Sequence, residues 1–405
     1  MRWRAFILVM ASAAAAAVPQ APAGAGPAFT LAQALARAQA NSPEFQAALA
    51  AVGLAQADTT QARAALLPAL NYNNSYIYTQ GFRFIASNSV HEYLSQGNLH
   101  VALDFGSAAV LKRAQAGEAL ARAEAEIATR GLAATVTGDY YALISAQHKQ
   151  ATAEQAVADA QRYLSISQDR ERGGEVAHAD VIKAQLEVQQ RQRDLTEAQL
   201  GVEQTRLALA VLLFPDFNQS YTLQDDLEQL PALPAAAEVQ ARAAQRNPEL
   251  AAAAAALEQA QEGVGIARAS LLPALTLDYF YGIDATQFAV HNALGQPNLG
   301  SAATATLTIP VFDWGANRAK LHQSDLRRRQ AQLQLSFTQR QVLANLQGFY
   351  AEAQAARTEV ADLASARTLA GESLRLTGLR YQNGEATILE LVDAQNTNTL
   401  ARDAY

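Results

Sequence analysis

The spacing of apolar and polar residues changes twice within each half of the chain. Residues 30–67 repeat alanine and leucine at helical spacing, and Thr30 with Gln33 forms the pattern of a capping box. Pro68 ends this pattern, and the residues after it alternate with the period of a strand. The same change occurs at Pro273. Both prolines therefore predict a joint between a helix and a strand.

Each proline is followed by a predicted hairpin. Residues 69–105 and 274–311 each contain two alternating strands, with polar loops at roughly 81–97 and 283–299. Leucine and tyrosine lie on one face of these strands, and asparagine, threonine and aspartate lie on the other. Tyrosines near strand ends are typical of the interface girdle of a membrane β-barrel. The same alternation fits a half-buried hairpin on a soluble domain, so the pattern leaves both interpretations open.

Very long helices are predicted after the hairpins. Residues 106–171 and 315–382 contain no proline, and about 66 helical residues form a rod of about 100 Å. Small or polar turn residues follow each rod, and they are Gly173, Gly174, Asn383 and Gly384. Returning helices are expected over residues 179–213 and 388–405. Each half thus reads as a helix, a hairpin, a long helix, a tight turn and a returning helix.

The two halves are copies of one unit. "ARAALLPAL" at 62–70 and "ARASLLPAL" at 267–275 differ at one of nine positions, 205 residues apart. The segments 104–106 (DFG) and 313–315 (DWG) recur 209 apart. A merely periodic helix does not keep prolines, aromatics and glycines in register, so we predict a tandem repeat.

The repeat sets the expected boundaries of the domains. The first repeat spans residues 26–213, a proline-containing linker spans 214–237, and the second repeat spans 238–405. The chain stops ten residues after Gln395, whereas the first returning helix continues for about 29 residues after the matching Gln185. The second returning helix is therefore expected to be truncated, as in a fragment or a shortened gene product.

The composition favours closely packed helices over one thick core. Half of the residues are apolar, but only 7% are aromatic and alanine supplies most of the apolar count. There is no cysteine, which excludes disulfides, thiolate metal sites and an N-terminal lipid anchor on cysteine. The six histidines are scattered without a catalytic or metal-binding motif. We therefore expect no enzyme, no catalytic residue, no cofactor and no bound metal.

The first 25 residues have the pattern of a secretory signal peptide. Arg2 and Arg4 precede an apolar run at residues 5–18, and Ala23-Gly24-Ala25 offers a cleavage site. Cleavage removes these two positive charges and changes the net charge from −7 to −9. That balance argues against a nucleic-acid partner.

Counting strands points to an oligomer if the hairpins lie in a membrane. Four strands cannot close a barrel, since about eight is the practical minimum, and lipid does not tolerate open strand edges. Three chains would pool twelve strands, and two chains would pool eight. Counting alone leaves both possibilities open.

With these features, the sequence resembles the TolC family of outer-membrane efflux channels. The twin A-R-A-x-L-L-P-A-L segments, Asn247-Pro248-Glu249, the segment 309–315 and the turn regions 174–185 and 381–395 carry the resemblance. Their order and duplication extend over nearly the whole chain after the signal peptide.

The resemblance implies a mainly α-helical membrane protein with two tandem repeats. It implies a homotrimer whose long antiparallel helices form an α-barrel tunnel, with four strands per chain in a twelve-stranded β-barrel. The channel would lie in outer-membrane lipid of a Gram-negative bacterium and extend into the periplasm. Its partners would be a periplasmic adaptor (membrane fusion) protein and an inner-membrane pump of the RND or ABC type. The duct would serve efflux or type I secretion and perform no chemistry.

The resemblance also implies that particular residues of this chain form a periplasmic gate. By position, Glu390 and Asp393 fall on a ring of carboxylates, Asp180 falls on an acidic position of the first tip, and Tyr381 falls on a tyrosine of the closing network. Relatives can carry an arginine where this chain has Ala386, which puts a salt-bridged latch in doubt. The competing interpretation is that acidic residues in a first helical turn serve the helix dipole, and that Tyr381 packs.

The adaptor is expected to dock at the tip, although Gly173, Gly174, Asn383 and Gly384 also have a structural reason to be there. A competing function is a soluble periplasmic adaptor with a long helical hairpin. Such a protein is expected to carry a β-rich lipoyl-like module, which the sequence lacks, and it would not explain the duplication.

Overall fold

The computed structural model describes residues 28–78, 91–227 and 231–405. The predicted signal peptide and part of the first hairpin loop lie outside these residues. The first repeat contains, in order, β1 (Ala28–Phe29), α1 (Leu31–Asn41), α2 (Pro43–Ala64), β2 (Ala69–Tyr78), β3 (His91–Leu103), α3 (Ser107–Arg172) and α4 (His178–Leu213). After β4 (Thr222–Leu223), the second repeat contains α5 (Ala236–Arg246), α6 (Pro248–Ala269), β5 (Ala274–Ala285), β6 (Leu299–Thr308), α7 (Ala316–Gln382) and α8 (Ile388–Ala404). The two repeats have the same order of helices and long strands, as the sequence predicted.

The prediction of one helix over residues 30–67 was wrong. The helix breaks at Ser42, which is extended at φ −72° and ψ 117° and accepts a hydrogen bond from the backbone nitrogen of Phe45. Pro43 follows, and a proline disfavours the helical conformation of the residue that precedes it. The second repeat has the same break, where Asn247 caps α6 in front of Pro248. Each repeat therefore begins with two helices.

The predicted loop at 81–97 was also too long. β3 begins at His91, and its residues pair with β2 on one side and with β5 from Tyr93 onward on the other. Backbone pairing with two neighbours holds this segment as a strand although most of its side chains are polar. The strand therefore extends beyond the part that the alternating pattern marks.

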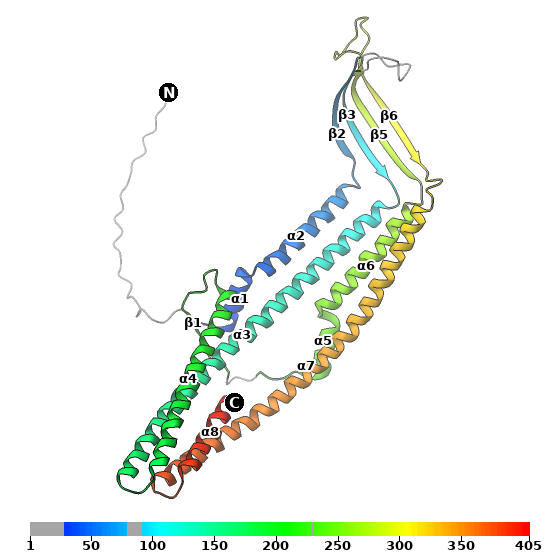
Figure 1. Ribbon diagram of the computed structural model, residues 1–405. Coiled ribbons are helices and arrows are strands. Elements are labelled where there is room, and N and C mark those ends of the chain that lie inside the picture. The colour runs from blue at the N-terminus through cyan, green and yellow to red at the C-terminus, as the bar shows by residue number, and fades with distance from the viewer. Residues whose placement is uncertain (1–27, 79–90, 228–230) are drawn as a thin grey trace, which may run out of the picture.

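The helices form one curved wall with the sheet at one end (Figure 1). α2, α3, α6 and α7 lie side by side, and α3 and α7 extend to the opposite end, where α4 and α8 return along them. α3 has 66 residues and α7 has 67, so each is about 100 Å long. Over the described parts of the chain, no helix combines the length and the apolar character needed to cross a membrane.

The sheet has the order β2-β3-β5-β6, and all its pairs are antiparallel. The register places Leu70, Leu99, Tyr279 and Ala303 in one row across the four strands. On the other face, His100 Nδ1 lies 2.7 Å from Asp278 Oδ1. One face of the sheet is therefore mainly apolar and the other mainly polar, because side chains alternate along a strand. In the described part of the chain, β2 and β6 are the edge strands, each paired on one side, and both are exposed along their whole length.

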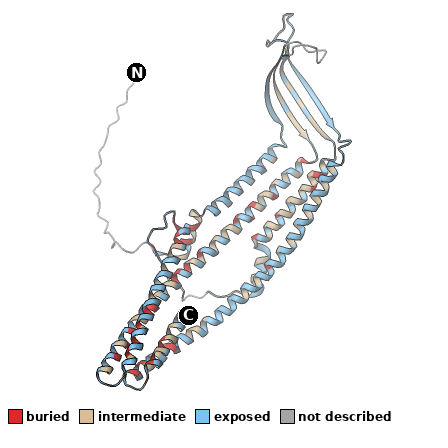
Figure 2. Cartoon of the chain, in the orientation of Figure 1, coloured by how far each residue is buried: buried red, intermediate tan, exposed pale blue. Residues whose placement is uncertain are grey.

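The main core lies where α1, β1 and α4 pack on the middle of α3 (Figure 2). Tyr140 is fully buried, and its hydroxyl lies 3.0 Å from the carbonyl oxygen of Phe29 and 2.7 Å from that of Gln224. β1 also pairs with β4 in the linker 214–237, which the sequence predicted to be irregular. The linker is thus held against the helical wall at mid-height.

Candidate functional site at the helical tips

The turns between α3 and α4 and between α7 and α8 lie next to each other at the end away from the sheet (Figure 1). Gly174 and Gly384 have φ values of 76° and 81°, in the left-handed region that glycine tolerates best. Gly173 and Asn383 are the C-caps of the long helices, and their backbone nitrogens donate to Asp169 and Leu379. All four predicted turn residues therefore serve to close the helices.

Arg170 joins the two tips. Its Nη1 donates to the carbonyl oxygen of Tyr381 at 2.8 Å, its guanidinium carbon lies 5.2 Å from the centroid of that ring, and its Nε donates to Glu175 at 3.1 Å. The side chain is only 13% exposed. The sequence interpretation missed this residue. An R-x-x-x-G-E pattern that recurs at Arg170 and Arg380, 210 residues apart, was the available signal.

Tyr381 is a packed residue of the tip. It is 1% exposed, and its hydroxyl lies 2.6 Å from Ser167 Oγ. Ser167 Oγ donates to the carbonyl oxygen of Tyr163, so the tyrosine hydroxyl is the donor to Ser167. Ala386 is also buried in this cluster, at the position where relatives can carry an arginine. Apolar packing and the Tyr381–Ser167 hydrogen bond therefore hold α7 against α3 at this end.

Glu390 takes part in the N-terminal cap of α8. Its carboxylate accepts a hydrogen bond from the backbone nitrogen of Thr387 at 2.7 Å, and Thr387 Oγ1 accepts one from the backbone nitrogen of Glu390 at 3.3 Å. The hydrogen bond from Thr387 lowers the pKa of Glu390. Asp393 is exposed one turn further on, and Asp180 is partly exposed at the start of α4. The capping contact supports the helix-end interpretation of Glu390, while the gate role of these carboxylates stays a prediction.

Above the tips, a second polar cluster connects α4 with α8. Arg191 Nε and Nη1 bind Glu187 at 2.7 Å and Asp194 at 2.8 Å, and Nη2 donates to Asn396 of α8. The arginine side chain is only 10% exposed. Sequence reasoning missed this contact, because nothing in the local pattern indicates which helix lies opposite Arg191.

At the other end, the helix-to-strand joints have a common construction. Pro68 and Pro273 each stand one residue before a strand, at β2 and β5. Asp104 accepts hydrogen bonds from the backbone nitrogens of Gly106 and Ser107 at 2.6 Å, and Asp313 accepts them from Gly315 at 3.0 Å and Asn317 at 2.8 Å. The repeated aspartates therefore bind backbone nitrogens at the start of the two long helices, and hydrogen bonds led by the Ser107 hydroxyl lower the pKa of Asp104.

Two repeats of the same helices and strands thus form one helical wall that ends in a four-stranded sheet. This arrangement defines a class of fold. Residues 34–213 and 239–405 match the outer membrane efflux protein family, and the chain belongs to that family. The structure is similar to the outer membrane protein VceC of Vibrio cholerae, with a TM-score of 0.80 and 22% identity over 92% of this chain and 91% of VceC. The predicted fold class and family are thereby confirmed.

Two curated relatives come from Pseudomonas aeruginosa. The chain is 25% identical to the outer membrane protein OprJ over 74% of its own length and 63% of OprJ, so it spans less than two thirds of that relative. It is 25% identical to the pyoverdine export outer membrane protein OpmQ over 91% of its length and 80% of OpmQ. The predicted localisation, the outer membrane of a Gram-negative bacterium, agrees with the family and is confirmed.

Proposed function

We propose that the chain is one protomer of a passive exit duct from the periplasm to the exterior. The observation that carries this proposal is the pair of open edges on one continuous wall. Within the described residues β2 and β6 each lack a partner on one side, and α2 and α7 are the outer helices of the wall beneath them. Open strand edges are not tolerated in lipid, so copies of the chain pair edge to edge.

Three copies give the twelve-stranded barrel and helical tunnel that the family resemblance implies. The apolar face of the sheet, with Leu70, Leu99 and Tyr279, faces lipid, and the polar face with His100 and Asp278 faces the lumen. Transport through this duct would depend on an inner-membrane pump of the RND or ABC type and a periplasmic adaptor, as the family resemblance implies.

Cell fractionation and gel mobility test this proposal. The mature protein is expected in the outer-membrane fraction, and an unheated sample is expected to migrate as an oligomer of three chains. Recovery in the soluble periplasm as a monomer would instead favour the competing structural or adaptor function.

We further propose that Glu390 and Asp393, with Asp180 and Tyr381 beside them, form a periplasmic constriction. Three chains would bring six carboxylates from Glu390 and Asp393 near the axis, and such a ring favours cations. Glu390→Gln keeps a side chain that can form the capping box but removes the charge. This substitution therefore separates the gate from the cap.

The gate is tested with Glu390→Gln/Asp393→Asn in planar bilayers. The variant is expected to lose cation preference and block by divalent cations. Glu359→Gln/Asp362→Asn removes two exposed charges from the middle of α7 and is the matched control. Equal cation preference and equal block by divalent cations in the two variants would leave Glu390 with its capping role alone.

We propose that the adaptor docks at the turns that contain Gly173, Gly174, Asn383 and Gly384. The chain has no cysteine, so one introduced cysteine is a unique cross-linking site. Glu385→Cys at the tip is expected to cross-link to a purified adaptor, whereas Arg329→Cys near the sheet is not. Equal cross-linking from both positions would contradict docking at the tip.

A further inference from the structure

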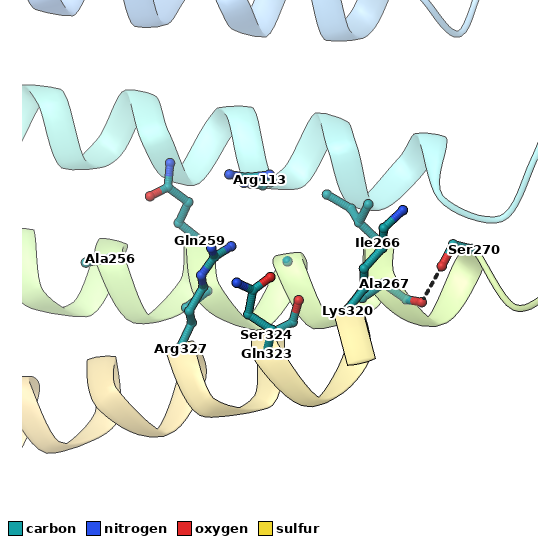
Figure 3. A pocket seen from close by; sticks show the side chains of 12 residues that line it. Arg113, Ala256, Gln259, Ile266, Ala267, Ser270, Lys320, Gln323, Ser324 and Arg327 are labelled. Carbon is teal, nitrogen blue, oxygen red and sulfur yellow. Dashed lines mark hydrogen bonds between the residues drawn. The ribbon is translucent and has the colours of Figure 1, made fainter. Parts of the chain in front are cut away.

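A basic groove lies on the helical wall near the sheet. It has a volume of about 480 Å³ and lies between α3, α6 and α7. Arg113 comes from α3 and Lys320 and Arg327 come from α7, on either side of α6 (Figure 3). The part contributed by α6 includes small residues at helical spacing, namely Ala256, Ala260, Gly263 and Ala267. These small side chains leave room between the three cations, and Gln259 of α6 adds a polar amide to the same groove.

Among the described residues, none of the three cations is paired with an acidic side chain. No acidic residue lines the groove, and within the part of the chain that the structure describes Arg113, Lys320 and Arg327 make no ion pair or hydrogen bond. By contrast, Arg122 and Arg375 each bind a glutamate three or four residues away on the same helix. A surface that gathers unpaired cations favours an anionic ligand.

The first repeat does not contain this set of charges. At the repeat offset of 209 residues, Lys320 corresponds to Leu111 and Arg327 corresponds to Glu118. The groove is therefore not a by-product of the duplicated helix pattern. It forms where α3 of the first repeat meets α6 and α7 of the second repeat, and two of its three cations come from α7.

The position of the groove indicates which anion it meets. Lys320 is four residues after the start of α7 and Arg327 is eleven, so they lie about 6 Å and 16 Å along the helix from its first residue. Between β6 and α7, Val311, Phe312 and Trp314 are 89%, 73% and 90% exposed. Exposed aromatic residues next to cations are typical of a membrane interface, where basic residues attract anionic lipids.

We propose that the groove binds the phosphate headgroup of an anionic phospholipid in the leaflet nearest the helices. This inference rests on the proposed outer-membrane channel. The headgroup phosphate lies among Arg113, Lys320 and Arg327, and the acyl chains extend toward Phe312 and Trp314. Each protomer thus carries one lipid site where its two repeats meet, and Lys320 and Arg327 of this site have no cationic counterpart in the first repeat.

Native mass spectrometry of the detergent-solubilised oligomer tests the proposal with phosphatidylglycerol and phosphatidylcholine. The unmodified protein is expected to retain phosphatidylglycerol in preference to phosphatidylcholine. Lys320→Gln/Arg327→Gln is expected to weaken phosphatidylglycerol binding by about fivefold per charge removed. Arg329→Gln/Arg357→Gln changes the net charge equally on the same helix and is expected to leave binding unchanged.

Three results would overturn the lipid site. They are equal retention of the two lipids, equal loss in the two double variants, and displacement by glycerol 3-phosphate at the concentration at which phosphatidylglycerol binds. The last result would indicate a site for a soluble anion. Conductance of the same preparations separates the two proposals, because a conducting protein without lipid preference refutes only the lipid site.

Trp314 provides an independent measurement. The chain contains two tryptophans, and the other, Trp3, lies in the predicted signal peptide. Brominated phosphatidylglycerol in vesicles of phosphatidylcholine is expected to quench Trp314 more than brominated phosphatidylcholine does, and Lys320→Gln/Arg327→Gln is expected to remove this difference. Equal quenching by the two brominated lipids in the unmodified protein would contradict the proposal.

Discussion

Tyr140 and Phe349 occupy the same position in the two repeats, but their surroundings differ completely. Tyr140 is fully buried against α1, β1 and the linker, whereas Phe349 is 66% exposed. α3 lies in the interior of the wall and contacts α2, α4 and α6, while α7 lies at its edge. Duplication therefore copied the sequence pattern of the helix but not its burial. The exposed face of the second repeat is where a neighbouring copy is expected.

The largest expected effect is the difference in the free energy of unfolding between substitutions at these two positions. Tyr140→Ala removes a buried aromatic ring and is expected to lower the free energy of unfolding by about 3–5 kcal/mol. Phe349→Ala is expected to change it by about 0.5 kcal/mol or less in the isolated chain, because the side chain is exposed there. Chemical denaturation followed by circular dichroism measures both values. Equal losses in the isolated chain would refute the difference in burial.

The tips offer a second comparison, between Arg170 and Arg380. Arg170 crosses to Tyr381 of the other repeat, whereas Arg380 donates to the carbonyl oxygen of Glu385 in its own turn, at 3.1 Å. Arg170→Ala is expected to cost about 1.5–3 kcal/mol, since hydrogen bonds from charged groups are the stronger ones. Arg380→Ala is expected to cost about 0.5 kcal/mol or less. Hydrogen exchange of residues 378–388 should rise in Arg170→Ala and stay near its original rate in Arg380→Ala.

The starts of the returning helices differ in their caps. Thr387 and Glu390 form a complete capping box in α8, whereas α4 begins after Ala177 with no side-chain cap. Thr387→Ala is expected to destabilise α8 by about 1 kcal/mol, and Ala177→Ser is expected to stabilise α4 by a similar or smaller amount. Local hydrogen exchange at the first turn of each helix measures the change. A loss of protection in both variants would contradict the assigned caps.

The smallest expected effect concerns pH. The pKa of Glu390 is lowered in the folded chain, so its cap stabilises α8 at pH values above the ordinary pKa of glutamate. The stabilisation is lost as the pH falls through the lowered value, because the protonated carboxyl accepts the Thr387 hydrogen bond less well. The protection factor at the start of α8, which is the exchange rate relative to the intrinsic amide rate at the same pH, should therefore fall in acid. Glu390→Gln should remove this pH dependence, and an unchanged acid profile would exclude Glu390 as its source.

Much of the fold could be predicted because local sequence patterns indicate where its helices and strands begin and end. Proline-free segments indicated α3 and α7, and Pro68 and Pro273 indicated the joints with the strands. The break at Ser42 had a local signal, a capping residue before proline, but the continuous alanine pattern concealed it. The start of β3 at His91 could not be predicted, because pairing with two neighbouring strands holds it.

The candidate site was predictable only in part. Family position led to Tyr381, and the structure adds that it is packed against Ser167. The contacts of Arg170 and Arg191 join segments that are about 200 residues apart in the sequence, and only the folded wall brings them together. Arg113 and Lys320 come from different helices, so the basic groove could be recognised only once α3, α6 and α7 were placed side by side.

Single-channel recording in planar bilayers tests the central claim most directly. The purified protein, migrating as an oligomer of three chains, is expected to insert and give discrete current steps of uniform size. Reproducible oligomers without any conductance, or a protein that stays monomeric and soluble, would contradict the assignment of this chain as a channel protomer.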